Sequence, residues 1–292
     1  MNLELSDFGG MKSMDIIGLL YGYKKIISTG LEPARMPTLK EAFEKYGLCY
    51  KVLDPSHDYK HQNLTYLISK SPVHIKAAAA AYRANRYDLI GELLGYPECC
   101  VREYYKRIRV NREDNDDFVR RCAANSRELF WPINNVLDFD GRLCGKKAAG
   151  VNLAGTAHPS LISHNPCSYD CKPSLELAKL NYTNLKSNIR RPGEEIDYSR
   201  LAKPVLYVDD FNLALLDGTA GPAGVKYRGV TCALGFGAIL DKLNAGDQVS
   251  VAGNALTILR GGKKILSKTF PVEPLLLPFD NRAIPGILKP RL

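Results

Sequence analysis

The sequence predicts an α+β protein, in which a helix-rich N-terminal α+β domain is followed by a small antiparallel β domain. Two observations support this class. Apolar residues recur mostly at helical spacing before residue 190, whereas after residue 204 they alternate as in strands. The later part also contains Gly253-Asn254 and Gly261-Gly262, which are typical two-residue hairpin turns.

A change of composition separates the two parts. Residues 190–203 are polar, with Arg190-Arg191-Pro192-Gly193, and are typical of a linker. We therefore expect one domain over 1–195 and a second over 196–292, the latter ending in a proline-rich basic tail from residue 276.

The first part contains apolar stripes that predict helices, separated by short strands. Ile16, Leu19 and Leu20 lie on one helical face, and Thr38 with Glu41 forms a capping box. Pro72 opens a helix that runs through an alanine-rich segment. The expected helices span 11–29, 38–46, 72–85, 87–94 and 118–130, and the expected strands span 48–53 and 64–69.

The second part is dominated by strand patterns. The expected strands span 205–216, 225–232, 248–252, 255–259 and 264–270. Gly235-x-Gly237 lacks the third glycine and the strand–helix context of a dinucleotide-binding loop, so we exclude that function for it.

Length and charge restrict the class of protein. The chain has 292 residues and no run of 18 apolar residues, so no membrane span is expected. Residues 1–15 lack a basic region followed by an apolar core, so no signal peptide is predicted, and we expect a cytoplasmic protein with reduced thiols. The net charge of +9 favours a nucleic acid or an acidic protein as partner, and is equally common as a solubility feature.

The first candidate site is Gly95-Tyr96-Pro97-Glu98-Cys99-Cys100. Pro97 suits the first position of a helix, because its missing N–H would be unpaired there. Cys99 and Cys100 then lie in the first helical turn, where the partial positive charge favours thiolate, the form that binds metal. The alternative is that both cysteines are small buried hydrophobic residues.

The second candidate site, from His164 to Ser174, repeats this arrangement. Asn165 is a plausible N-cap and Pro166 a first helical residue, so a helical turn would place Cys167 and Cys171 on one face. His164 lies close before Cys167. Packing of the two thiols, or a structural hydrogen-bonding role for His164, is the alternative.

Together these residues predict a metal centre. One of Cys99 or Cys100, with Cys167 and Cys171, would supply three thiolates, because adjacent cysteines rarely bind one tetrahedral ion together. Three thiolates suit an iron–sulfur cluster with an open iron, which we favour as a [4Fe–4S] cluster; zinc with His164 as fourth ligand is the alternative. Cys144 and His158 are reserve candidates.

The two motifs, Leu94-Gly95-Tyr96-Pro97-x-Cys99-Cys100 and His164-x-Pro166-Cys167-Ser168-x-x-Cys171, carry a resemblance over about residues 60 to 190. This region resembles an uncharacterised archaeal and bacterial family of domain-of-unknown-function proteins. The resemblance implies that the two motifs belong to one site, and it implies no mechanism.

Two functions follow from the residues. The first is an enzyme whose open metal site acts as a Lewis acid on an acidic or nucleic-acid-related substrate. The second is a module without catalysis, in which structural zinc stiffens a nucleic-acid-binding or protein-binding surface. A thiol-redox enzyme is less favoured, because no Cys-x-x-Cys motif is present. We favour the enzyme from the sequence and keep the binding module as the alternative.

Overall fold

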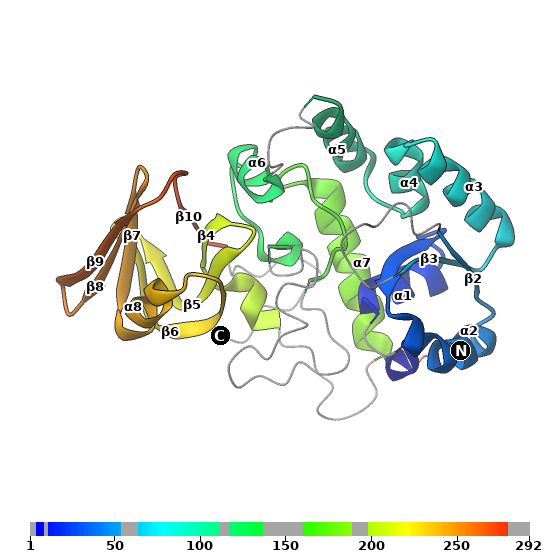
Figure 1. Ribbon diagram of the computed structural model, residues 1–292, viewed down its shortest axis with the longest axis horizontal. Helices are drawn as coiled ribbons and strands as arrows, with labels where there is room; N and C mark the ends of the chain where they lie inside the picture. The colour runs from blue at the N-terminus through cyan, green and yellow to red at the C-terminus, as the bar shows by residue number, and fades with distance from the viewer. Residues whose placement is uncertain are drawn as a thin grey trace.

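The computed structural model describes residues 4–8, 11–53, 64–110, 117–136, 160–188 and 198–279. It confirms the α+β class: a helix-rich N-terminal part is followed by a seven-stranded antiparallel sheet (Figure 1). None of the helices in these ranges combines the length and the apolar character needed to cross a membrane.

The N-terminal part contains a three-stranded antiparallel sheet with strand order β1-β3-β2. Its strands are β1 (Ile27–Leu31), β2 (Cys49–Val52) and β3 (Leu64–Ser69). The central strand is buried on both faces: Tyr66 and Ile68 belong to one core cluster, whereas Leu67 packs into another that includes Ala78 and Ala79. This alternation follows from the two-residue period of a strand.

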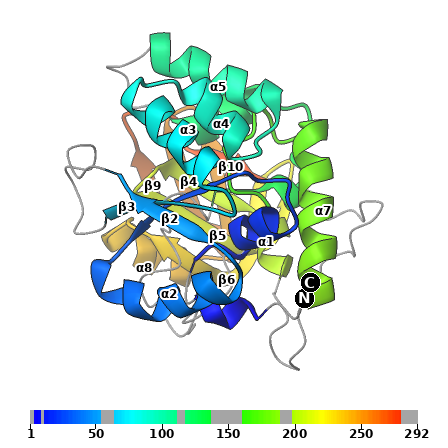
Figure 2. The same ribbon diagram turned by 90° about the vertical axis from the view of Figure 1, so that its right-hand side faces the viewer.

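Helices make up the rest of the N-terminal part. They are α1 (Ser13–Leu20), α2 (Met36–Lys45), α3 (Pro72–Arg83), α4 (Tyr87–Leu93), α5 (Glu98–Val110), α6 (Phe118–Ala124) and α7 (Lys172–Asn188). Among them, α3 contacts β2 and β3 while α1 contacts β1. Short 3₁₀ helices are η1 (Leu5–Phe8), η2 (Pro33–Arg35), η4 (Trp131–Ile133) and η6 (Tyr198–Ala202). Figure 2 shows α3, α4 and α5 gathered at one side of the sheet, with α7 along the flank of the molecule.

Two helix predictions were too long. The helix expected over 11–29 ends at Leu20, because Gly22 adopts a positive φ of 89° and the following segment pairs with β3 as strand β1. The helix expected over 118–130 ends at Ala124. Beyond it, the Ser126 hydroxyl bonds back to the Cys122 carbonyl, and Phe130 N donates to the Tyr169 carbonyl. Tertiary pairing therefore overrode the helical pattern in both segments.

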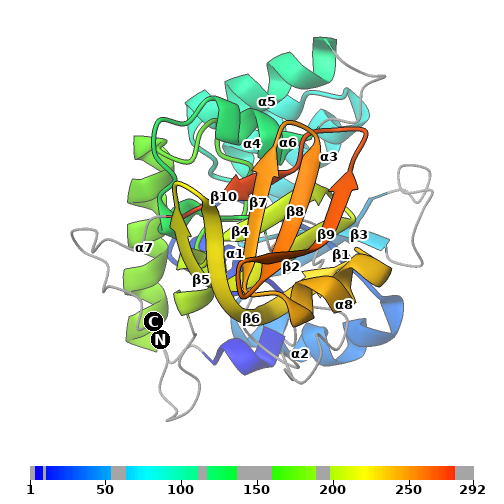
Figure 3. The same cartoon turned by 90° about the vertical axis from the view of Figure 1, so that its left-hand side faces the viewer.

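The C-terminal sheet has strand order β10-β4-β5-β6-β7-β8-β9, and every pair is antiparallel. Its strands are β4 (Val205–Asp209), β5 (Asn212–Gly221), β6 (Gly224–Leu234), β7 (Gln248–Ala252), β8 (Ala255–Arg260), β9 (Lys263–Thr269) and β10 (Leu275–Leu277). One further helix, α8 (Ala238–Ala245), lies beside this sheet (Figure 3). The expected hairpin glycines connect β7 to β8 and β8 to β9.

The single strand expected over 205–216 was wrong, because a tight turn divides it. The Asp209 carboxylate accepts hydrogen bonds from the Phe211 amide (2.8 Å) and from the Asn212 side-chain amide (3.0 Å), which fixes the reversal between β4 and β5. The segment expected to open the proline-rich tail instead forms β10, which pairs with β4.

The two parts of the chain are joined by packing and by polar contacts. The largest core cluster includes Ile17 of α1 and Leu185 of α7 together with Val205 and Leu215 of the seven-stranded sheet. Figure 1 shows α7 midway along the molecule, between the small sheet and the large one. The expected domain boundary at residues 195 and 196 lies within residues 189–197, which are outside the described ranges, and it stays a prediction.

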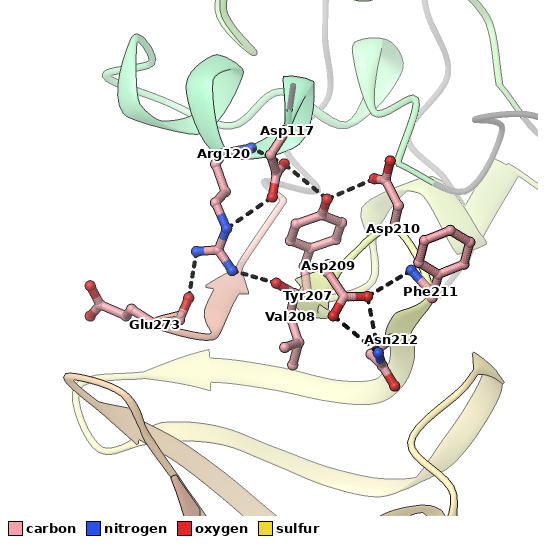
Figure 4. A network of polar contacts seen from close by, with 9 residues as sticks. All are labelled: Asp117, Arg120, Tyr207, Val208, Asp209, Asp210, Phe211, Asn212 and Glu273. Carbon is pink, nitrogen blue, oxygen red and sulfur yellow. Dashed lines mark hydrogen bonds and ion pairs between the residues drawn. The ribbon is translucent and has the colours of Figure 1, made fainter. Parts of the chain in front are cut away.

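A polar network fastens α6 to the large sheet (Figure 4). Asp117 caps α6 by accepting from Arg120 N at 2.9 Å, and its carboxylate also pairs with the Arg120 guanidinium. That guanidinium donates to the backbone carbonyls of Val208 and Glu273, which flank the pairing of β4 with β10. The Tyr207 hydroxyl lies 2.9 Å from Asp117 Oδ1, so the cap residue of α6 and Arg120 within α6 both contact the sheet.

Candidate metal centre

The first thiol pair is held at the start of α5. Gly95 adopts a positive φ of 72° and lies so close to the Tyr23 carbonyl oxygen that a Cβ would overlap it. The Pro97 carbonyl accepts hydrogen bonds from the amides of Cys100 (2.9 Å) and Val101 (3.0 Å). Cys99 and Cys100 therefore lie in the first turn of a 13-residue helix, as the sequence predicts.

The second thiol pair is held by a turn rather than by a helix. The helical turn expected after Pro166 is wrong: residues 160–171 contain no helix, and Cys171 N bonds to the Ser168 carbonyl at 3.2 Å. The Cys171 carbonyl accepts from Leu175 N at 3.0 Å, so Cys171 stands at the N-terminus of α7. Cys167 and Cys171 are therefore brought together by a turn that leads into the start of α7, and not by sharing one face of a helical turn as we expected.

The segment that follows α6 braces this turn. Asn125 Nδ2 donates to the Cys167 carbonyl at 3.1 Å, and the Arg127 amide donates to the Asp170 carboxylate at 3.0 Å. The Tyr169 amide donates to the Ser126 hydroxyl at 2.6 Å, while the Tyr169 ring is fully buried. Hydrogen bonds with residues 125–127 therefore hold the turn in place and fix the direction of its thiols.

The two motifs converge, as the sequence predicts. The Sγ atoms of Cys99, Cys100, Cys167 and Cys171 all lie within 4.8 Å of one another. Cys99 Sγ is 3.9 Å from Cys100 Sγ and 3.6 Å from Cys171 Sγ, and Cys100 Sγ is 3.7 Å from Cys171 Sγ. The Cys167 amide points at Cys100 Sγ over 3.3 Å. Four thiols so placed could hold a metal.

Both neighbouring cysteines belong to this group, although only one of them was expected as a ligand. Cys99 and Cys100 are successive residues in the first turn of α5. The backbone amide of Cys167 contacts Cys100 Sγ. The geometry therefore allows Cys99 and Cys100 to bind the same metal ion.

The close approach of the thiols shifts the pKa values of three of the four cysteines. Hydrogen bonds from the Cys100 and Cys167 thiols lower the pKa of Cys171 well below its ordinary value. The Cys167 and Cys171 thiols, with burial, raise the pKa of Cys100 far above it. A hydrogen bond with Cys100 lowers the pKa of Cys167, but Cys171 and burial outweigh it and raise that pKa to about 12. A thiolate at Cys171 therefore disfavours ionisation of Cys100 and Cys167, and a cation between the sulfurs would offset that repulsion.

His164 lies one side chain away from the thiols. Its Nε2 is 2.9 Å from the Ser174 hydroxyl, which is itself 3.3 Å from both Cys100 Sγ and Cys171 Sγ. Burial, and then the positive charge of Lys24, lower the pKa of His164 to about 3, so its ring is neutral. His164 is not in the group of ligand atoms within 4.8 Å, and its expected role as a ligand stays a prediction.

The remaining candidates are separate from the four thiols. Cys122 is buried in the core of the N-terminal part, as expected, and Cys49 and Cys232 lie in strands β2 and β6. Cys144 and His158 lie outside the described residues. Sequence reasoning missed the roles of Ser174 and Ser126; Ser174 stood inside the second motif, but nothing in its spacing indicated contact with the thiols.

Comparisons with known proteins agree with the resemblance in part. A search of the curated proteins found no match, and a search of the solved structures found none either. Residues 71–190, which contain both thiol pairs, match the model of a family described as a protein of unknown function (DUF483).

Proposed function

We propose that the protein binds a single zinc ion through Cys99, Cys100, Cys167 and Cys171, and that this centre is structural. The observation that carries the proposal is the spacing of the sulfur atoms. Zinc–sulfur bonds of about 2.3 Å in a tetrahedron place the sulfurs about 3.8 Å apart. The separations of 3.6, 3.7 and 3.9 Å among Cys99, Cys100 and Cys171 fit that geometry.

The same spacing gives less support to the [4Fe–4S] cluster that the sequence favoured. In such a cluster each cysteine binds a different iron, so the sulfurs must stand farther apart than sulfurs that share one ion. The cluster therefore requires the four thiols to spread from their positions here, whereas a single ion does not.

The number of thiols supports a structural role. Catalytic zinc sites keep a position open for water or substrate, whereas structural sites use four protein ligands. Four thiols fill the tetrahedron here, and they tie the start of α5 to the turn before α7. In this proposal His164 and Ser174 support the thiolates by hydrogen bonding and do not bind the ion.

The proposal is tested by purifying the protein anaerobically and measuring metal, sulfide and visible absorption. We expect one zinc ion per chain, no acid-labile sulfide and no colour, and X-ray absorption at the zinc edge should give a shell of four sulfurs. A brown protein that contains iron and acid-labile sulfide would show that the thiols hold an iron–sulfur cluster and would overturn the zinc proposal. Protein that neither retains nor takes up metal would reduce the four thiols to core packing.

A further inference from the structure

One face of β7, β8 and β9 stays accessible to solvent. Strand pairing and the two-residue period of a strand separate the two faces. Val249, Leu256 and Ile258 are fully buried in the core cluster that contains Leu243 of α8. The other face, which we call the outer face, keeps part of its surface exposed and includes Lys226, Gln248, Ser250, Thr257, Lys264 and Ser267. Figure 3 is a view of this end of the molecule, with β7, β8 and β9 in front.

The outer face is ordered into rows that cross the strands. Strand pairing aligns four residues in the first row, namely Lys226, Gln248, Leu259 and Lys264. A lysine therefore stands at each end of a row that spans about 14 Å, three times the spacing of neighbouring strands. The next row along the strands consists of hydroxyl side chains, namely Ser250, Thr257 and Ser267.

The charge of this region is of one sign. Residues 248–272 contain no aspartate or glutamate, whereas they contain the four cations Arg260, Lys263, Lys264 and Lys268. Lys226 and Lys264 make no ion pair with any described residue, and the three hydroxyls of the second row make no hydrogen bond with one. The outer face therefore offers unused donors and positive charge, which favour a partner rich in negatively charged acceptors.

Protection of the sheet edge explains only part of this charge. β9 is the last strand of the sheet, and lysines on such a strand discourage its pairing with another chain. Lys226 lies on β6, inside the sheet, so that role does not account for it.

The acids that border Lys226 are engaged elsewhere. Asp217 and Asp247 line a cavity of about 440 Å³ together with Lys203, Lys226 and Arg228. Asp217 pairs with Lys203 at 3.0 Å and with Arg228 at 3.2 Å, whereas Asp247 accepts from a backbone amide at 2.7 Å. Neither acid pairs with Lys226, so its charge is available to a partner.

We propose that the outer face binds the backbone of double-stranded RNA, with Lys226 and Lys264 on phosphates and the hydroxyl row on ribose 2′-hydroxyls. Among the described residues of this face there is no aromatic side chain, so it lacks the stacking surface that holds single-stranded bases. An open sheet face suits the wide and shallow minor groove of an RNA duplex, which displays 2′-hydroxyls. Serine and threonine hydroxyls both donate and accept, as the 2′-hydroxyl does.

The test is fluorescence anisotropy with the full chain and an RNA duplex of about 16 base pairs, the length that one double-stranded-RNA-binding domain spans. We expect saturable binding that weakens as the salt concentration rises, because phosphate contacts release counterions. The competitors are a DNA duplex of the same sequence, single-stranded RNA and polyglutamate. Each should compete less well than the unlabelled RNA duplex.

Two double variants locate the contact. Lys226→Gln with Lys264→Gln should weaken binding about tenfold and reduce the slope of log affinity against log salt by about two, because two phosphate contacts are lost. Lys40→Gln with Lys76→Gln removes the same charge from exposed positions in α2 and α3, and should leave both quantities nearly unchanged. Circular dichroism checks that each variant is folded.

A third double variant tests the choice of RNA. Ser250→Ala with Thr257→Val removes two hydroxyls and no charge, so it should reduce the preference for RNA over DNA at an unchanged salt slope. Absence of binding to the RNA duplex, equal losses in the two lysine variants, or a competitor as strong as the RNA duplex overturns the proposal. So does an RNA preference that survives the loss of both hydroxyls. Zinc content is measured in the same samples, and its absence from the wild type overturns the zinc centre alone.

Discussion

Cys99 and Cys171 are separated by 72 residues in the sequence, yet their Sγ atoms lie 3.6 Å apart. Each stands at the start of a long helix, α5 or α7, so two sets of partly positive helix N-termini meet at the same point. This meeting of two helix starts brings the thiols of both motifs to one point, and the four sulfur atoms so gathered are a candidate site for a metal ion.

Replacing single cysteines should separate ligands from the other thiols. We expect Cys167→Ser and Cys171→Ser each to lose bound metal, because a hydroxyl does not replace the soft thiolate ligand. Cys49→Ser and Cys232→Ser are the controls, since these thiols lie in strands outside the group, and they should keep full occupancy. Metal analysis of the purified variants is the measurement, and full metal content in both Cys167→Ser and Cys171→Ser would contradict the site.

Removing the metal should loosen one region and leave another unchanged. The thiols tie α5 to the turn before α7, whereas β7 and β8 pack into a separate core cluster that contains none of the four cysteines. With a chelator, we expect faster amide hydrogen exchange over 97–101 and 165–175, and unchanged exchange in β7 and β8. Equal acceleration throughout the described residues would mean that the metal stabilises the whole fold rather than this junction.

The Arg120 network should stabilise the attachment of α6 to the large sheet. Arg120→Ala removes donors to the Val208 and Glu273 carbonyls and the pair with Asp117, at a site where the arginine side chain is only 20% exposed. Hydrogen bonds that involve a charged group contribute about 1.5–3 kcal/mol, and we expect a loss of stability of that order.

Urea unfolding measures that loss, and Arg228→Ala is the matched control. Arg228 also pairs with an aspartate, but its side chain is 88% exposed, so its removal should change stability by less than about 0.5 kcal/mol. Similar losses in the two variants would show that the α6 network contributes no more than a surface pair.

Gly95 should be required for the position of α5. Gly95→Ala must place a Cβ against the Tyr23 carbonyl oxygen, in addition to adopting a positive φ. Gly22→Ala is the control, because Gly22 also has a positive φ but no atom within 4 Å of the added Cβ. The control should lose about 1–2 kcal/mol of unfolding free energy from the backbone conformation alone. Gly95→Ala should lose more, and its zinc affinity should fall; equal losses would show that the close approach is relieved without cost.

The buried pair of Lys24 and Asp15 should make stability depend on pH in the acid range. Lys24 Nζ lies 2.9 Å from Asp15 Oδ1, and the lysine side chain is 1% exposed. Burial would raise the pKa of Asp15, but Lys24 and Lys12 outweigh it, and the pKa is lowered from 3.8. The stabilisation is therefore present above pH 3.8 and is lost as the pH falls through the lower folded-state value.

Asp15→Asn imitates the protonated carboxyl at every pH. At pH 7 it should cost about 3–5 kcal/mol, because it leaves the buried charge of Lys24 unpaired. The difference in unfolding free energy between wild type and variant should shrink as the pH falls below the ordinary carboxyl range, and using the difference cancels metal loss common to both proteins. Asp88→Asn, at an exposed pair, is the control. A difference that stays constant down to acid pH would contradict the ionised pair.

The sequence by itself determined the α+β class, the two hairpin turns and the placing of Cys99 and Cys100 at a helix start. These features depend on local patterns: alternation, glycine at a turn, and proline before a helix. β3 and β7 were predicted with their observed bounds for the same reason. The pairing of the two thiol motifs was also foreseen, because both contain thiols next to prolines in one part of the chain.

Only the tertiary structure decided how the second motif holds its thiols and which groups surround them. Residues 166–171 form a turn because side chains and backbone of 125–130 pair with it, and that segment lies far away in the sequence. His164 reaches the thiols through Ser174, which depends on the direction in which α7 begins. Such contacts depend on how distant segments pack and not on local propensity, so no spacing in the sequence could have indicated them.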